Sequence, residues 1–565
     1  MIFLVIVLFA SISNKILGQF SPCSERIVIQ TDREMYIAGE EMFFKCCLAG
    51  NDHKNRTTQS RYAYLVIRNE QNALISNICM KLEDGNFSGS IYLPDTLSTG
   101  RYQLVSYTNY MRNFSEGNYC TKEIFVANRF DKDLINIYSG AIKQDSTNAK
   151  NSLAETNAKR NLISIVPEKS KYAKRDKIKI SLENSGTTDS ELANLSISVH
   201  EKTFQTDNIQ NNIKTEVVGT NKICKYLREV RGVILEGNVL NNDNQKVVPN
   251  ALVYLSTQDT VANLQFAYSD SNGVFRFQLN NYYNSKTLII SLPENPQNHI
   301  VIDNKYELKE PFKPSKVFSD QSIRDYLIKS QNIVQIQKEY ETVNKKGIID
   351  STITQDFPPL LYPPVSDPIY PSDFVSLPDF IEISREIIPL LSTRKHGLGY
   401  ESKIYNTATS ELFQNGPLIL LDGVPINSVN QIINLGSEKI NKIEVKDAER
   451  YYGGRFYSGI LSIFSKNLEI NNIVWQTPMV SLNYVQLHPQ TTFNPTVPFK
   501  SEWTPDFRQL LYWNPSITIE PKGKKFIEFT ASDNKGKFEI SVVGVTKDGN
   551  LVKSSKDFEI VDKNL

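Results

Sequence analysis

The sequence lacks an excess of charge of either sign. Its 565 residues include 63 basic and 62 acidic side chains, for a formal net charge of +1. A chain that binds nucleic acid or an anionic membrane through bulk charge carries a clear basic excess, so we expect neither as a partner. Beyond the first residues no segment reaches about 18 uninterrupted apolar positions, so we also expect no helical membrane anchor.

Motifs for catalysis and metal binding are missing as well. The five histidines lie far apart and form no HxxH or HExxH pattern (His53, His200, His299, His396 and His488), so the usual spacing of zinc ligands is absent. There is no GxSxG elbow, no GxGxxG after a strand and no phosphate-binding loop. The paired glycines of YYGGRF (451–456) are interpreted as a turn. We therefore expect no enzyme, no cofactor and no metal ion.

Cysteine is scarce, and five of the six cysteines lie in the first 120 residues; the six are Cys23, Cys46, Cys47, Cys79, Cys120 and Cys224. The run MIFLVIVLFA at residues 1–10 is typical of the apolar core of a secretory signal peptide, which we place at residues 1–18. We therefore expect an exported protein, in the periplasm or associated with an outer membrane. Export permits disulfides, so bridges in the first domain, free core cysteines and lipidation of Cys23 all remain open.

Aromatic residues and short alternating runs are plentiful. The chain has 27 Tyr and 28 Phe, which favour β-sheet. Runs such as YAYLVIR (62–68) and GSIYL (89–93) are separated by turn residues, as expected for half-buried strands. The predicted fold class is mostly β and multi-domain, with tandem β-sandwiches and one small α+β domain.

Two motifs define the first sandwich, TDREMYIAGEEMFF (31–44) and LPDTLSTGRYQLVSYTNYMRN (93–113). Together they resemble the MG2 domain of the α2-macroglobulin superfamily, which implies an immunoglobulin-like sandwich over residues 24–130. The following stretch, 131–160, is polar at its end and is predicted to be a linker. Residues 161–228 repeat the strand pattern and resemble a second macroglobulin-like sandwich.

Residues 229–305 contain a PNALVYL strand and an SDSNGVFRF hairpin. This segment resembles a carboxypeptidase regulatory-like domain, a small β-sandwich, with Asp270, Asn272 and Gly273 in the turn and Phe275 and Phe277 on one face. Loosely helical spacing over SIRDYLIKSQNIVQIQKEY predicts an amphipathic helix in the connector 306–345. The prolines of the next connector, 346–375, predict an extended spacer packed along the protein rather than a ligand for an SH3-type domain.

The stretch 417–466 begins PLILLDGVP and ends GILSIFSK. Its order of strand, Asp-Gly turn, strand, polar-apolar run and two further strands resembles the plug domain of TonB-dependent outer-membrane receptors, here over residues 376–470. The 565-residue chain ends 99 residues after Lys466, from which we expect no receptor barrel to follow. Alternating runs in 471–565 predict a C-terminal sandwich. Within it, TPDFRQLLYWNPSITIEPKGKKFIEF (504–529) resembles the strand-turn-strand of macroglobulin-like domains, which implies a macroglobulin-like sandwich.

Five residues of the plug-like segment are candidate interaction or turn residues: Asp422, Gly423, Lys446, Arg450 and Arg455. An Asp-Gly pair between strands is first of all a two-residue turn, and the three cations are first of all a solvated cluster. The functional alternatives are a carboxylate used in binding and a cationic clamp for a ligand.

The order of these predicted domains along the chain resembles that of a group of envelope proteins of Bacteroidota. They imply a non-catalytic binding or scaffold protein at the outer membrane, whose partner is an outer-membrane barrel or another envelope protein. The alternative is a macroglobulin-type protease inhibitor or host-protein-binding surface protein. It would act without a thioester, because Cys224 is followed by KYL rather than GEQ. A third hypothesis is glycan binding through Tyr282 and Tyr283, which strand-end packing also explains.

Overall fold

The computed structural model describes residues 25–50, 59–128, 130–131, 163–185, 192–202, 224–294, 296–314, 348–350, 356–363, 365–475, 477–484, 487–493, 504–545 and 551–562, together with seven positions between 326 and 336. The predicted signal peptide (1–18), Cys23 and residues 132–160 of the predicted linker lie outside these residues. The protein is mostly β and multi-domain, which confirms the predicted fold class. None of the helices in the described part of the chain has the length and apolar character needed to cross a membrane.

The chain divides into two compact units. Unit 1 comprises Met1–Val230, Tyr306–Thr352 and Leu487–Leu565, and unit 2 comprises Arg231–Lys305 and Ile353–Gln486. Each unit is therefore assembled from segments that are distant in the sequence.

The first sandwich of unit 1 follows the predicted MG2-like segment and has two facing sheets. One sheet has the order β1-β3-β6 (Glu25–Thr31, Glu41–Gly50 and Asn86–Tyr92), and all its pairings are antiparallel. The other has the order β2-β8-β7-β4-β5 (Met35–Ile37, Cys120–Ala127, Gly100–Tyr107, Tyr62–Asn69 and Leu74–Lys81), with β2 and β8 parallel. The short helices η2 (Tyr110–Asn113) and η3 (Glu116–Asn118) connect β7 to β8.

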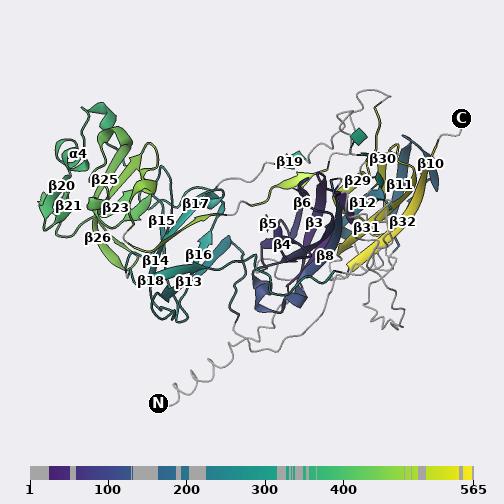
Figure 1. Cartoon of the computed structure of the whole chain (residues 1–565), viewed down its shortest axis with the longest axis horizontal. Helices are drawn as coiled ribbons and strands as arrows, with labels where there is room; N and C mark the ends of the chain where they lie inside the picture. Colours follow the sequence, from purple (N-terminus) through teal and green to yellow (C-terminus); the bar gives the residue numbers. More distant parts are fainter. Residues whose placement is uncertain are drawn as a thin grey trace, which may run out of the picture. The chain divides into compact units, whose positions relative to one another are not determined.

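The second sandwich of unit 1 differs from the expectation of two separate domains at 161–228 and 471–565. Strands from both stretches share its sheets, and Figure 1 shows β12 between the yellow strands β29 and β31. One sheet has the order β30-β11-β9 (Lys524–Thr530, Lys177–Asn184 and Ile163–Pro167). The other has the order β10-β32-β31-β12-β29 (Lys171–Ala173, Leu551–Val561, Gly536–Val545, Leu192–Glu201 and Leu510–Ile519).

This shared sandwich has a physical reason. Strand β11 alternates exposed and buried positions and needs a neighbour on each side, and its neighbours are β9 and β30. The core joins Ile178, Ile180 and Val199 from the earlier segment to Phe538 and Ile540 from the later one. Four strands from one segment would leave that apolar face open to water, whereas eight strands close it.

Two further segments pack on the first sandwich. The carbonyl of Glu229 accepts from the backbone N–H of Arg61, and its carboxylate accepts from Tyr64 Oη at 2.7 Å. Arg68 Nη1 donates to the carbonyl of Glu310 at 2.6 Å. Residues 224–230 and 306–312 therefore lie against this sandwich, not in the second sandwich or in a helical connector.

Of the helix predicted in the connector 306–345, the described positions between 326 and 336 are helical. In the same unit β19 (Ile348–Asp350) pairs with β28 (Gln490–Thr492).

Unit 2 begins with a sandwich over the predicted regulatory-like segment. One sheet has the order β16-β13-β18 (Val274–Leu279, Val233–Asn241 and Asn298–Ile302), and the other β15-β14-β17-β27 (Leu264–Tyr268, Leu252–Thr257, Thr287–Ser291 and Met479–Asn483). The predicted turn is present, with the carboxylate of Asp270 accepting from the backbone of Asn272 and Val274. Phe275 and Phe277 are both buried in the core. Strand β27, expected in the C-terminal sandwich, instead extends this sheet by pairing with β17.

A mixed four-stranded sheet follows in unit 2, where the plug-like domain is predicted. Its order is β24-β23-β26-β25 (Val424–Ile426, Leu418–Leu421, Arg455–Ser465 and Ile440–Tyr452). The pair β23–β26 is parallel and the other two pairs are antiparallel. The polar-apolar run between β24 and β25 forms two short 3₁₀ helices, η6 (Val429–Gln431) and η7 (Ser437–Lys439), not one long helix.

Both faces of this mixed sheet are covered. One face shares a core with helix α4 (Phe380–Glu386) and with β20 and β21 (Leu391–His396 and Gly399–Asn406), through Phe380, Ile404 and Ile463. Asp379 caps α4 by accepting from the backbone of Glu382 at 2.9 Å, and Pro389 follows the helix end. Short elements complete unit 2: η4 (Asn281–Tyr283) in the sandwich, and β22 (Glu411–Leu412), η5 (Pro371–Asp373) and η8 (Glu469–Asn472) beside the mixed sheet.

The other face packs on the outer face of β14 and β15, and the proline-rich stretch contributes to this cluster. Leu418, Leu420 and Ile460 meet Tyr254 and Tyr362 there. The hydroxyl of Tyr362 donates to Glu444 Oε2 at 2.7 Å. Within unit 2 the stretch is therefore a spacer packed on the protein.

Candidate functional site

Asp422 and Gly423 form the predicted turn between β23 and β24. Both have positive φ, 52° and 81°, as a type I′ turn requires. The Asp422 carboxylate is buried and accepts from Ser465 N at 2.7 Å, Ser465 Oγ at 2.8 Å and Ile470 N at 3.2 Å. A Cβ atom on Gly423 would lie 2.9 Å from the carbonyl of Thr257. The structure thus places this pair inside the protein, as a turn and an internal hydrogen-bonding centre.

The three candidate cations lie on the β25–β26 hairpin but do not converge on one point. Lys446 is half-buried before a β-bulge, and Arg450 is exposed beyond it. Gly459, on the opposite strand of the bulge, has a φ of 95°. Arg455 begins β26 and is half-buried, with its Nε donating to Glu294 Oε1 at 2.7 Å. Of the three, Arg455 lines the cavity described below.

The tip of this hairpin presents an exposed aromatic pair. Tyr451 and Phe456 lie opposite each other in the register and are 74% and 52% exposed. Successive residues of a strand point to opposite faces, so Tyr451 and its partner Phe456 lie on the opposite face of the hairpin from Tyr452. The ring of Tyr452 packs against Phe266 with centroids 4.9 Å apart. We call Tyr451 and Phe456 the aromatic tip.

The outer edge of β25 is only partly paired. Ile443 exchanges two backbone hydrogen bonds with Ile369, at 2.8 and 2.9 Å. Past that bridge, no other strand of the described chain pairs with this edge, and β25 continues to Tyr452. An open strand edge carries N–H and C=O groups that another chain can pair with.

A cavity of about 260 Å³ lies between the mixed sheet and the sandwich of unit 2. Its polar lining comes from Tyr254, Ser291, Asn427, Arg455, Tyr457 and Thr477. The hydroxyls of Tyr254 and Tyr457 are 2.6 Å apart, and Asn427 Nδ2 donates to Thr477 Oγ1 at 3.3 Å. Beyond Arg455, no local sequence pattern points to this site, because residues of β14, β17, β23, β24 and β26 all contribute to its walls.

Unit 1 contains a buried polar cluster that the sequence pattern does not predict. It lies in the TDREMY motif, whose aspartate and arginine a sequence pattern assigns to the surface. Asp32 Oδ1 accepts from Tyr36 Oη at 2.8 Å and from Phe43 N at 2.9 Å, and Arg33 Nη2 donates to Glu40 Oε2 at 2.7 Å. Asp32 Oδ2 is buried without a hydrogen-bond partner. Burial raises the pKa of Asp32 to about 6, against the opposing attraction of Arg33.

The cluster continues onto the second sandwich of unit 1. Ser198 Oγ donates to the carbonyl of Asp32, and His200 Nδ1 lies 3.1 Å from Ser198 Oγ. Burial, helped by repulsion from Arg33, lowers the pKa of His200 to about 3. Tyr326 Oη donates to Gln509 Oε1 at 3.1 Å. These groups hold structural elements of unit 1 together.

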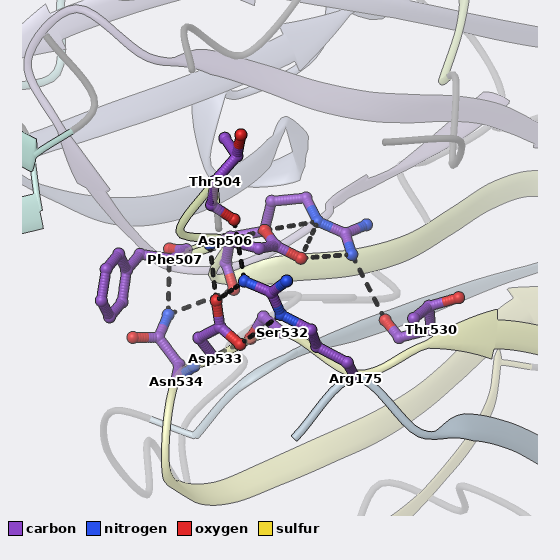
Figure 2. A network of polar contacts seen from close by, with 9 residues as sticks. Arg175, Thr504, Asp506, Phe507, Thr530, Ser532, Asp533 and Asn534 are labelled. Carbon is purple, nitrogen blue, oxygen red and sulfur yellow. Dashed lines mark hydrogen bonds and ion pairs between the residues drawn. The ribbon is translucent and has the colours of Figure 1, made fainter. Parts of the chain in front are cut away.

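A second polar network joins the two segments of the same sandwich (Figure 2). Arg175 donates to Asp533 through Nε at 2.8 Å and Nη2 at 2.7 Å, and Nη2 also reaches the carbonyl of Thr504 at 2.8 Å. The carboxylate of Asp533 accepts from the backbone N–H of Asp506. Arg508 donates to the Asp506 carboxylate through Nε and Nη2, at 2.7–3.0 Å. Because these charges satisfy one another, the network ties the two segments together.

Two further sequence hypotheses can be compared with the structure. Tyr282 and Tyr283 are 3% and 1% exposed, so neither ring is available to stack on a glycan, and the packing interpretation holds. No disulfide joins Cys46, Cys47, Cys79, Cys120 and Cys224 to one another in the described chain. Across the described residues, no three His, Cys, Asp or Glu side chains gather closely enough to hold a metal ion.

Comparisons with known proteins add little to this description. No family model matches the chain, and no curated protein matches it. Among solved structures, α2-macroglobulin of Salmonella reacted with methylamine is similar over 97% of this chain and 40% of its own, with 9% identity and a TM-score of 0.24. Native α2-macroglobulin of E. coli gives the same coverage and score at 8% identity. The Yersinia pseudotuberculosis adhesin InvE is similar over 51% of this chain and 61% of its own, with 12% identity and a TM-score of 0.13.

The chain therefore spans about 40% of the length of the macroglobulins to which it is similar. Scores this low do not place it in a family, and the activities of those proteins do not transfer to it.

Proposed function

We propose that this protein is a non-catalytic binding or scaffold protein of the cell envelope, and that unit 2 is its interaction module. The observation that carries the proposal is the β25–β26 hairpin, where the exposed pair Tyr451 and Phe456 adjoins an open strand edge. Exposed aromatic side chains of this size are enriched at the centres of protein interfaces. The envelope location rests on the apolar run at residues 1–10.

The partner is proposed to be an envelope protein that offers an extended segment. Backbone groups of such a segment would pair with β25 beyond Ile443 and lengthen the sheet by one strand. Its side chains would then cover Tyr451 and Phe456, which removes apolar surface from water. An outer-membrane barrel protein is the kind of partner that the plug-like order of strands implies.

The test is co-purification of the tagged protein from its own cells under mild detergent. We expect the wild type to enrich an outer-membrane protein and the double variant Tyr451→Ser, Phe456→Ser to lose it. Phe526→Ser is the control, because Phe526 is 73% exposed on β30 of unit 1. Recovery of the wild-type protein alone, or equal enrichment by the wild type and the double variant, would contradict the proposal.

A further inference from the structure

The cavity of unit 2 has hydrogen-bonding capacity that the protein does not use. Arg455 contacts Glu294 Oε1 through Nε and Nη2, and its remaining N–H groups have no partner in the described part of the chain. One hydroxyl hydrogen of the Tyr254–Tyr457 pair is committed to the hydrogen bond between them. The second hydroxyl hydrogen remains free to donate. One end of the cavity is therefore rich in donors.

The rest of the cavity is mixed in character. Asn427 and Thr477 form a second polar group, and three prolines add rigid apolar surface (Pro293, Pro417 and Pro425). Leu418 and Ile426 are each 5% exposed and also contribute to the lining. A concave site with apolar walls and a few convergent polar groups is the usual form of a small-molecule site.

We propose that this cavity binds a small organic carboxylate, with the carboxylate against Arg455 and the tyrosine hydroxyls and the remainder of the ligand against Asn427 and Thr477. A guanidinium presents its N–H groups as a planar fork that matches a carboxylate, and a charge-assisted hydrogen bond is about twice as strong as a neutral one. The site lies on the opposite face of the hairpin from the aromatic tip and does not depend on partner binding there.

Glu294 is the internal competitor for this ligand. Its carboxylate already pairs with Arg455, but its side chain is 49% exposed. Ion pairs with an exposed partner contribute little free energy, so an incoming carboxylate can take the place of Glu294 while that side chain turns to water. This arrangement makes a specific prediction: removing the charge of Glu294 strengthens ligand binding, whereas removing that of Arg455 weakens it.

The carboxylate has two chemical sources of suitable size, the C-terminus of a short peptide and a uronic acid. The probes form two pairs of an acid and its neutral analogue. The first pair is N-acetyl-alanyl-alanine and the C-terminal amide of that peptide, and the second is glucuronate and glucose. Each pair differs only at the carboxylate or the group in its place. Titration calorimetry on the full-length protein measures affinity for all four. We expect one acid to bind and its neutral analogue to bind at least about tenfold more weakly.

Three variants complete the experiment. Arg455→Gln should weaken binding of that acid about tenfold or more, and Glu294→Gln should tighten it severalfold. Arg394→Gln, which removes an exposed cation of β20 outside the cavity, should leave it unchanged. The proposal is overturned if neither acid binds the wild type at millimolar concentration, if acid and neutral analogue bind equally, or if Arg455→Gln binds as the wild type does.

Discussion

Asp32 illustrates how a single residue can make stability depend on pH. Its carboxyl is fully buried, and burial raises its pKa to about 6 although Arg33 and the hydroxyl of Tyr36 favour the charged form. Glu40, which faces the same group, adds repulsion in the opposite sense. The unfolded chain has an ordinary aspartate pKa near 4, so the folded protein binds this proton more tightly than the unfolded chain does.

The sign of the effect follows from that difference. The contribution of Asp32 to stability is present below about pH 4 and is lost as pH rises through about 6, a change of roughly 2–3 kcal/mol. His200 acts in the opposite direction. Its pKa is lowered to about 3 by burial, so its contribution is present above about pH 6.5 and is lost as pH falls.

The pH dependence of stability that arises from Asp32 has the opposite sign to that from His200. The stability of the wild type measured against pH therefore does not isolate the contribution of Asp32. The measurement is urea unfolding of the wild type and of Asp32→Asn at pH 4.5 and pH 7. We expect the stability of the wild type relative to the variant to fall by about 2 kcal/mol between these values. An unchanged difference would show that the carboxyl titrates at its ordinary pKa.

Asp422 is a residue where removal of a buried acceptor should be costly. Its carboxylate takes three hydrogen bonds, from two groups of Ser465 and from the backbone of Ile470. Asp422→Ala leaves those donors buried without a partner, so we expect a loss of about 2–4 kcal/mol in the unfolding of unit 2. Asp447→Ala is the control, since that carboxylate accepts from Thr407 at an exposed site. Equal losses in the two variants would argue against an internal role for Asp422.

At the scale of elements, the β25–β26 hairpin depends on the bulge at Gly459. The φ of this glycine is 95°, and an added Cβ would lie 2.6 Å from the carbonyl of Lys446. Gly459→Ala should therefore cost about 2–3 kcal/mol, from backbone strain and the close approach together. Gly397→Ala separates the two causes, because Gly397 has a φ of 58° but nothing within 4 Å of the added Cβ.

Denaturant unfolding of both glycine variants gives the comparison. The cost at Gly397 should be about 1 kcal/mol, the strain of a left-handed conformation alone. If both variants lose the same amount, the contact with Lys446 contributes nothing. A loss of affinity for the partner in Gly459→Ala without a loss of stability would instead mean that the bulge only orients the aromatic tip.

Local patterns predicted the hairpins well, because a hairpin is specified by adjacent residues. The Asp422–Gly423 turn and the turn at Asp270 were both assigned from turn residues between alternating runs. Two things could not be predicted in this way. The pairing of β12 with β29 joins strands more than 300 positions apart, and no local pattern encodes that. The cavity combines side chains from five strands, so its residues share no motif.

At the scale of the whole molecule, the scaffold role and the alternative of protease inhibition predict different outcomes when the protein meets a protease. A macroglobulin-type inhibitor needs a loop that proteases cleave. The polar stretch 144–160, within the predicted linker, is the candidate that the sequence offers for such a loop, and it lies outside the described chain. We expect incubation with trypsin, elastase and subtilisin to leave the activity of each protease on a large protein substrate unchanged. Nicking within 144–160 accompanied by loss of that activity would favour the inhibitor instead.

The second sandwich of unit 1 allows a decisive test of how the chain is organised. A chain that ends after Thr492 lacks β29 to β32 and, with them, Phe538, Ile540 and the other apolar residues that close the core. Strands β9 to β12 should then lose their amide protection, because Ile178 and Ile180 would face water. Hydrogen exchange read by mass spectrometry over residues 177–184 measures this, and residues 418–421 of unit 2 serve as the protected reference.

Addition of the missing segment in trans provides the control for this truncation. A fragment spanning 504–562 should restore protection over 177–184 when mixed with the truncated chain, since it supplies the neighbours of β11 and β12. The Arg175–Asp533 pair lies across the same junction, so Asp533→Ala in the fragment should weaken the reconstitution. If residues 177–184 stay protected in the truncated chain without the fragment, the segment 163–202 folds by itself, and the two stretches form separate domains after all.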